Sequence, residues 1–396
     1  MKTVTWIAAG LVAWAAVGLA QTGAPVPQGP PNADFAPAFP NQTRAPALPD
    51  SGVSSVVLVR GLEHPWGIAE LPDGRFLVTE RPGRLRLVTL GQGVSAPISG
   101  VPEVDARRQG GLLDVAVAPD FDRTRRVWLT YAKPVPGGTV TAAGWGVLSE
   151  DGTALDGFRD IFVQTPPSPT PMHFGSRIVF EPGTGHAFIT TGEHSRARER
   201  VLAQDNETTY GKVVRVDALT GAPAPGNPFI GGPGLDVIWS TGHRNPQGAA
   251  IGPDGALWTI EHGPRGGDEL NRPGPGDNHG WPVVSYGIEY DGGLVGSGQP
   301  RAVGFVEPVY FWDPVIAPGG MEFYAGDRFP EWQGDLLIGG LVAAAVVRLK
   351  IEDGRVAGEE RLVEGVGRVR DVEVTSGGEV LVLIDAPNGE IRQLTR

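Results

Sequence analysis

The chain repeats one pattern six times from Ser51 onward. Each copy has a small or polar lead-in, a short apolar strand, a turn resembling Pro-Asp-Gly, and a second apolar strand that often ends in Thr-Glu or Thr-Gly. Turns of the Asp-Gly and Gly-Gly type between apolar runs indicate hairpins, because glycine adopts positive φ angles at little cost. The clearest copy reads PWGIAELPDGRFLVTERPGRLRL, and the other five begin at Gly110, Phe174, Asn245, Gly319 and Val369.

These repeats predict an all-β fold. Several copies continue into a third strand, and no segment has sustained helical periodicity. A meander of this size cannot bury both of its faces alone, so six copies predict a six-bladed β-propeller of four-stranded antiparallel blades. A spare strand within residues 53–59, SSVVLV, is expected to complete the last blade and close the ring. The alternative fold is a stacked pair of β-sandwiches.

The N-terminal region indicates export. Lys2, the apolar stretch Trp6–Leu19 and the small residues before Gln21 are typical of a signal peptide over residues 1–20. An uncleaved N-terminal anchor is the alternative. Residues 21–50 contain eight prolines and predict a Pro-rich flexible tether outside the fold, which leaves 51–396 as the propeller. A protein built this way is periplasmic or secreted, with no stable membrane insertion after signal cleavage.

Charge and composition exclude several functions. Lys and Arg total 33 against 45 Asp and Glu, a net charge of −12, so nucleic acid is an unsuitable partner. The chain has no cysteine, which excludes disulfides, thiolate metal sites and cysteine nucleophiles.

One histidine stands where a catalytic base is expected. His173 lies at the entrance to an innermost strand, and the innermost strands of a propeller line its axial funnel. Glu193 lies at the far end of the hairpin that begins after His173, so its carboxylate can reach the ring. A carboxylate on one ring nitrogen fixes the tautomer and makes the other nitrogen a better base. The alternative is a histidine that is merely buried in the core.

Arginines in two later repeats indicate an anionic ligand. Arg244 and Asn245 occupy the equivalent point of the repeat after that of His173. Arg368 and Arg370 lie on one face of a strand, since residues two apart point the same way. No acidic partner is evident near them in the sequence, so an anion between or above them is the better explanation.

A third constellation, EHGPRGGDELN, spans Glu261–Asn271. Its glycine-rich backbone exposes carbonyl oxygens, and Asp268 and Glu269 add carboxylates. Hard oxygen ligands suit Ca²⁺, although the spacing is not that of an EF-hand. The alternative is an acidic surface turn.

Together these segments resemble the soluble pyrroloquinoline quinone (PQQ)-dependent glucose and aldose sugar dehydrogenases. The resemblance covers nearly the whole chain after residue 50. It implies PQQ, a Ca²⁺ ion that holds and polarises it, and hydride transfer from C1 of an aldose to C5 of the quinone, giving the lactone. Because the chain has no CxxCH haem motif, a separate periplasmic electron acceptor is implied. The resemblance rests on HPWGIAELPDGRFLVTER, RRQGGLLDVAVAPDF, HFGSRIVF, GKVVRVD, GHRNPQG, EHGPRGGDELN, DNHGWP and GRVRDV, in that order.

The resemblance also implies roles for individual residues. His173 matches the general base, Glu193 its acidic partner, and Arg244 a group that stabilises negative charge on the quinone. The remaining matches are cofactor contacts from Gln109, Arg244, Asn245, Arg368 and Arg370, calcium ligands from the backbone carbonyls of Gly263 and Pro264, and a substrate contact from Asp268.

Three positions depart from the family pattern. Val342 stands where the family has a lysine against the quinone, Met172 replaces a polar residue, and His279 replaces an aromatic one. Two other functions stay open from the residues alone. A calcium-dependent lactonase would share the acidic mouth but would have no use for Arg368 and Arg370. A non-catalytic binding propeller would carry aromatic patches in place of buried charges on its axis.

Overall fold

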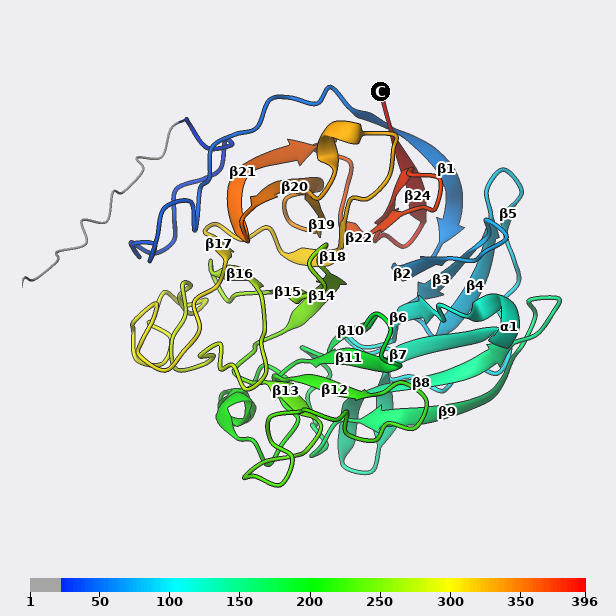
Figure 1. Ribbon diagram of the computed structural model, residues 1–396, viewed down its shortest axis with the longest axis horizontal. Coiled ribbons are helices and arrows are strands. Elements are labelled where there is room, and N and C mark those ends of the chain that lie inside the picture. Colours follow the sequence, from blue (N-terminus) through cyan, green and yellow to red (C-terminus); the bar gives the residue numbers. More distant parts are fainter. Residues whose placement is uncertain (1–22) are drawn as a thin grey trace, which may run out of the picture.

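The computed structural model describes residues 23–396, and these form six four-stranded antiparallel sheets arranged around one axis (Figure 1). The predicted six-bladed β-propeller is therefore confirmed. The predicted signal peptide, residues 1–20, lies outside the described residues. Within residues 23–396, no helix is long and apolar enough to cross a membrane.

Five blades are built from four consecutive strands each. Blade 1 contains β2 (Pro65–Glu70), β3 (Phe76–Glu80), β4 (Arg84–Thr89) and β5 (Gly93–Val94); blade 2 contains β6 (Leu112–Val117), β7 (Arg126–Val135), β8 (Gly138–Leu148) and β9 (Leu155–Val163). Blade 3 contains β10 (Gly175–Phe180), β11 (His186–Thr191), β12 (Val213–Asp217) and β13 (Ile238–Ser240); blade 4 contains β14 (Pro246–Ile251), β15 (Leu257–Glu261), β16 (Asp268–Asn271) and β17 (Tyr310–Trp312). Blade 5 contains β18 (Pro318–Phe323), β19 (Leu336–Gly340), β20 (Ala345–Glu352) and β21 (Arg355–Leu362). The short helices are α1 (Phe121–Thr124), α2 (Ala197–Arg200), η1 (Val201–Gln204) and η2 (Pro330–Trp332).

Blade 6 joins the two ends of the propeller. It contains β22 (Val369–Val374), β23 (Val380–Ile384) and β24 (Gly389–Thr395), and its outer strand is β1 (Ser54–Leu62) from the start of the domain. Ser54 pairs with Thr395 and Leu62 with Gly389. The spare strand predicted from the sequence thus closes the ring, as Figure 1 shows where β1 lies beside β24.

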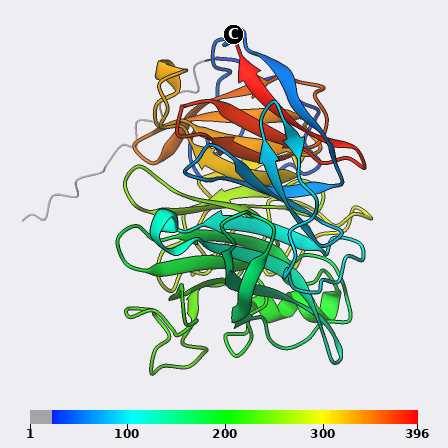
Figure 2. The same cartoon turned by 90° about the vertical axis from the view of Figure 1, so that its right-hand side faces the viewer.

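The apolar core lies between neighbouring blades, which Figure 2 shows from the side of the molecule. The second strand of each blade buries side chains on both of its faces, because its neighbours in the sheet cover its edges and adjoining blades cover its faces. Complete burial of such a side chain contributes about 1.5–3 kcal/mol relative to exposure. Each of these six strands has a fully buried apolar residue, and examples in chain order are Leu77, Leu129, Ile189, Ile260, Ile338 and Val382.

The prediction of a tether outside the fold is wrong for residues 23–50, which we call the N-terminal strap. The strap runs beside β17 and β21 (Figure 1). Phe311 N–H donates to the carbonyl of Gln42 at 2.8 Å, and Ala45 N–H donates to the Tyr310 hydroxyl at 3.0 Å. Ala47 forms a parallel bridge with Glu359. Prolines favour extended backbone, so this segment lies against the outer strands of blades 4 and 5 without forming regular structure of its own.

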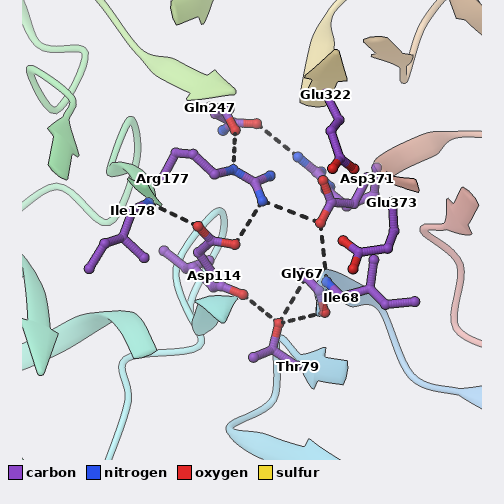
Figure 3. A network of polar contacts seen from close by, with 12 residues as sticks. Gly67, Ile68, Thr79, Asp114, Arg177, Ile178, Gln247, Glu322, Asp371 and Glu373 are labelled. Atoms are coloured by element: carbon purple, nitrogen blue, oxygen red, sulfur yellow. Dashed lines mark hydrogen bonds and ion pairs between the residues drawn. The ribbon is translucent and has the colours of Figure 1, made fainter. Parts of the chain in front are cut away.

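The propeller axis is occupied by a charged side chain (Figure 3). Arg177 on β10 places Nη1 2.7 Å from Asp114 and 3.2 Å from Asp371, and its Nε donates to the carbonyl of Gln247 at 3.1 Å. Its guanidinium also lies over the ring of Trp66, 4.6 Å from the centroid. One arginine therefore links the innermost strands of blades 2, 3, 4 and 6.

Candidate active site

The predicted site residues gather at one end of the axis. The innermost strands of the six blades contact one another in a ring and run in the same direction along the axis; they are β2, β6, β10, β14, β18 and β22. Residues that directly precede them therefore lie at the same end. Gln109 precedes β6, His173 precedes β10, Asn245 precedes β14, and Arg368 precedes β22.

His173 and Glu193 form the expected pair. Nδ1 of His173 lies 3.1 Å from Oε1 of Glu193, and both side chains are buried. The backbone N–H of His173 donates to Oε1 of Gln109 at 2.8 Å, and the His173 backbone has a φ of 48°. This left-handed conformation is costly for a residue other than glycine, and it persists because neighbouring contacts fix it. No hydrogen bond occupies Nε2 of His173 among the described residues.

The surroundings of this pair set its protonation. Burial lowers the pKa of His173 below its usual 6.5, and the nearby charge of Arg244 lowers it further, against the opposing effect of Glu193. Burial acts to raise the pKa of Glu193, but the interactions with His173 and Arg244 outweigh it and the pKa is lowered. The pair is therefore a neutral imidazole beside a carboxylate, which is the arrangement of a general base and its orienting group.

Arg244 is held by hydrogen bonds from its backbone and its side chain, and one nitrogen of its guanidinium has no partner among the described residues. Its N–H donates to Oε2 of Glu261 at 2.5 Å, and its Nη1 donates to the carbonyl of His262 at 3.0 Å. The guanidinium lies 5.2 Å from the ring centroid of Trp281. Its Nε is buried and has no hydrogen-bond partner among the described residues. A buried donor of this kind is costly unless a ligand accepts from it.

Asn245 and Gln109 accept hydrogen bonds from the backbone at the start of β10. Oδ1 of Asn245 accepts from Gly175 N–H at 3.0 Å, and Oε1 of Gln109 accepts from His173 N–H. These two side chains hold the backbone on either side of Phe174, so they position the base. Contacts from them to a cofactor stay a prediction.

Arg368 and Arg370 have an acidic partner that the sequence did not reveal. Asp385, which follows β23, lies 3.0 Å from Nη2 of Arg370 and 3.8 Å from Nε of Arg368. The hairpin of β22 and β23 brings Val369 opposite Ile384, and this pairing delivers Asp385 to both arginines. The expectation that they lack a local acidic partner is therefore wrong.

Asp385 does not neutralise this region. Burial lowers the pKa of Arg370 below its usual value, and Arg368 and Arg81 lower it further against the raising effect of Asp385. Nε of Arg370 is buried and has no hydrogen-bond partner among the described residues, and its Nη1 donates to Gln247 at 2.8 Å. Arg370 thus feels the charges of two further arginines and of one carboxylate, and this excess of positive charge still suits an anion.

Asp268 has a buried side chain that is bonded to backbone groups. Its side chain is fully buried, and its two oxygens accept backbone N–H groups from Gly263, Ile316 and Ala317, each at 2.8 Å. Burial raises the pKa of Asp268 to about 7. The carboxylate therefore ties the loop after β15 to the segment before β18, and a contact from it to the substrate stays a prediction.

The predicted calcium loop surrounds a small cavity. A Cβ on Gly263 would lie 2.2 Å from the carbonyl oxygen of Gly266 and 2.3 Å from that of Gly267, so backbone oxygens crowd this point. Gly263, Pro264, Glu261 and Glu269 are among the residues that line the cavity. Burial raises the pKa of Glu269 well above its usual value, and the charges of Glu261 and Glu307 raise it further.

This donor set fits a hard cation. Carbonyl and carboxylate oxygens suit Ca²⁺, and a cation would relieve the repulsion between Glu261 and Glu269. Among the described residues, no three His, Cys, Asp or Glu side chains form a metal-binding group, so carbonyl oxygens would have to supply part of the coordination. His279 stacks on His243 with centroids 4.6 Å apart, beside the cavity.

Sequence patterns assigned no individual role to Glu261 and His262, which both line the cavity. Glu261 ends β15 just as Glu80 ends β3, and Glu193 follows the end of β11 by two residues, so the repeated glutamate at or after the end of the second strand was the available signal. His262 lies 3.2 Å from Gln247 through Nε2 and Oε1, and nothing in the sequence marked this contact.

Comparisons with known proteins identify the family of the chain. Residues 62–393 match the family model described as glucose/sorbosone dehydrogenase. The chain belongs to this family. It is therefore an oxidoreductase that acts on sugar donors, which overturns the alternative of a non-catalytic binding propeller.

Individual relatives extend over most of the chain. The protein is 43% identical to aldose sugar dehydrogenase YliI of Escherichia coli strain K12, over 87% of this chain and 93% of the relative. A crystal structure of a glucose dehydrogenase superposes with a TM-score of 0.83 at 44% identity, covering 87% of this chain and 99% of the other. The PQQ-bound form of the aldose sugar dehydrogenase of Streptomyces coelicolor superposes with a TM-score of 0.70 at 26% identity, covering 88% and 100%.

Proposed function

We propose that this protein oxidises the C1 hydroxyl of an aldose to the lactone, with PQQ as hydride acceptor and Ca²⁺ as its metal partner. The observation that carries the proposal is the buried pair of His173 and Glu193, placed at the same end of the axis as arginines with unpartnered donors. A neutral histidine beside an anion site is what proton removal from a hydroxyl next to an anionic acceptor requires.

The residues of the chain divide this work. His173 accepts the proton of the C1 hydroxyl at Nε2 while Glu193 holds Nδ1 and stabilises the charged ring that results. Arg244 directs a positive charge at the acceptor, and its contacts with Glu261 and His262 keep it in place. Because these groups are fixed before the reaction, little reorganisation accompanies charge development.

The cofactor is supported by the unpartnered donors. PQQ carries three carboxylates, and the Nε atoms of Arg244 and Arg370 are buried donors that such an anion would satisfy. When bound, PQQ supplies the electrophilic carbon that accepts hydride, and Ca²⁺ polarises the quinone. Arg244, Asn245, Arg368 and Arg370, with Gln109, would hold PQQ, and Gly263 and Pro264 would hold Ca²⁺ by their carbonyls.

The position of the missing family lysine is open to solvent. The Val342 side chain is 60% exposed in the turn between β19 and β20. It adds no charge to the site, so we assign the compensating positive charge to Arg244 and to the arginines around Asp385. The protein is proposed to work in the periplasm or outside the cell, where a separate acceptor takes the electrons.

Reconstitution tests the proposal. Purified apoprotein is titrated with PQQ and Ca²⁺ in the presence of an artificial electron acceptor, and a panel of aldoses is surveyed. Dye reduction that needs both additions is expected, with a lactone as product. Hydrolysis of a lactone without dye reduction by any sugar would overturn the proposal in favour of a calcium-dependent lactonase.

A further inference from the structure

We infer that the N-terminal strap positions the calcium loop, and that Asn32 is the positioning residue. The calcium loop is defined here as residues 263–267. The inference rests on the proposed role of this loop in binding Ca²⁺. It assigns a task to a segment whose composition alone indicates a tether.

Asn32 is joined to the outer strand of blade 4 through Asp313. Its N–H donates to Oδ2 of Asp313 at 2.8 Å, and its Nδ2 donates to Oδ1 at 2.6 Å. Ala33 N–H donates to the same carboxylate at 2.9 Å. The strap therefore supplies three donors to one buried carboxylate that lies 280 residues further along the chain.

The same carboxylate and the same asparagine touch the calcium loop. Oδ1 of Asn32 accepts from Nε of Arg265 at 2.9 Å. A Cβ on Gly266 would lie 2.5 Å from Oδ1 of Asp313, so the carboxylate packs directly on the backbone of the loop. Gly267 N–H donates to the carbonyl of Trp312, the residue before Asp313, at 2.8 Å.

The loop is thus held from two sides. On the inner side, Asp268 accepts from Gly263 N–H. On the outer side, Asn32 and Asp313 fix Arg265 and Gly266. These contacts bracket Gly263 and Pro264, whose carbonyls are the proposed ligands. Groups that orient metal ligands from behind typically change metal affinity by 10–100-fold when removed.

The strap has independent attachments that keep Asn32 in place. Nε2 of Gln42 donates to the carbonyl of Pro308 at 2.9 Å, and Ala45 N–H donates to the Tyr310 hydroxyl. Leu48 N–H donates to the carbonyl of Glu359 on blade 5 at 2.8 Å. The Leu48 side chain packs beside Gly358 of blade 5, on the part of the strap that is attached to β21, so it offers a matched control within the same segment.

The test compares Asn32→Ala with Leu48→Ala in the whole protein. Calcium affinity is measured by calorimetry on apoprotein without PQQ, and hydrogen exchange of residues 263–267 is measured without calcium. We expect Asn32→Ala to weaken calcium binding about tenfold or more and to speed exchange in the loop. Leu48→Ala is expected to leave both quantities at the wild-type value.

The outcomes separate this inference from the proposed function. Equal calcium affinity and equal loop exchange in Asn32→Ala and wild type would overturn the inference while leaving the proposed function intact. An equal loss in both variants would also overturn it, since the effect would then be a general loosening of the strap. A wild-type protein that binds no calcium would remove the metal from the proposed function and the inference with it.

Discussion

Nδ1 of His173 lies 3.1 Å from Oε1 of Glu193 across the two ends of one hairpin. The contact fixes the imidazole so that Nε2 is the nitrogen left to meet a ligand. It also places a carboxylate where it stabilises the ring once the ring is charged. Both effects act on proton transfer and leave cofactor binding to other residues, so the two functions can be separated by mutation.

The first prediction concerns the base itself. His173→Ala removes the proton acceptor but none of the arginine donors. We expect the variant to bind PQQ with affinity close to that of the wild type and to lose turnover by ~10²–10⁴. A PQQ titration followed by single-turnover kinetics measures the two quantities. Lost binding with intact turnover per bound cofactor would contradict the role assigned to His173.

The second prediction concerns the acidic limb of the pH profile of kcat. The pKa of His173 is lowered from 6.5, so the neutral ring and the activity persist below that pH in the wild type. Glu193 favours the charged ring, so Glu193→Gln should move the limb to lower pH while lowering kcat. Arg200 disfavours the charged ring, so Arg200→Gln should move the limb to higher pH. Shifts of the same sign in both variants would refute this electrostatic account.

The third prediction concerns the anion site. Arg370→Gln removes a buried charge whose Nε is unpartnered, so PQQ affinity should fall by about 10–100-fold, the equivalent of a charge-assisted hydrogen bond. Equilibrium titration at saturating Ca²⁺ measures the change. Arg60→Gln is the control, because Arg60 is a largely exposed arginine paired with Glu390. Unchanged PQQ affinity in Arg370→Gln would show that the quinone does not bind beside Arg370 on β22.

The fold and the catalytic pair could be predicted because both depend on local order along the chain. Repeated hairpins set the blades, and a hairpin necessarily brings its two ends together, which is how His173 reaches Glu193. The pairing of Asp385 with Arg370 depends on the register of β22 and β23, which the repeat pattern did not define to within one residue.

Other features depend on contacts that sequence patterns do not encode. Whether Asp268 faces a ligand or the backbone depends on the path of the loop before β18, 48 residues away. The strap has no periodicity, and its hydrogen bonds reach residues such as Asp313, 281 positions from Asn32. Composition indicated a flexible segment because it carries no information on the strands elsewhere in the chain, here the outer strands of blades 4 and 5, against which the segment packs.

The fourth prediction concerns stability at the propeller axis. Arg177→Met leaves Asp114 and Asp371 buried without their shared cation, and loss of one partner of a buried pair costs about 3–5 kcal/mol. Urea unfolding at constant pH measures the loss. The double variant Arg177→Met with Asp114→Asn should regain part of it, since one uncompensated carboxylate is removed. A single variant as stable as the wild type would mean that the arginine does not hold the blades together.

The last prediction concerns how stability changes with pH at Glu322, which lies near the C-terminal end of β18. Burial raises the pKa of Glu322 to about 8, with repulsion from Asp371 and Glu70 adding to it. The folded state therefore holds this proton to higher pH than the unfolded state does. Its contribution is fully present below the unfolded pKa, near 4.5, and is lost as pH rises toward 8. The free energy of unfolding should fall across this range, and Glu322→Gln, which cannot ionise, should reduce the fall by about 1 kcal/mol or more. Denaturant titrations at pH 5, 6.5 and 8 measure the slope, and a slope equal to that of the wild type in Glu322→Gln would show that other groups cause it.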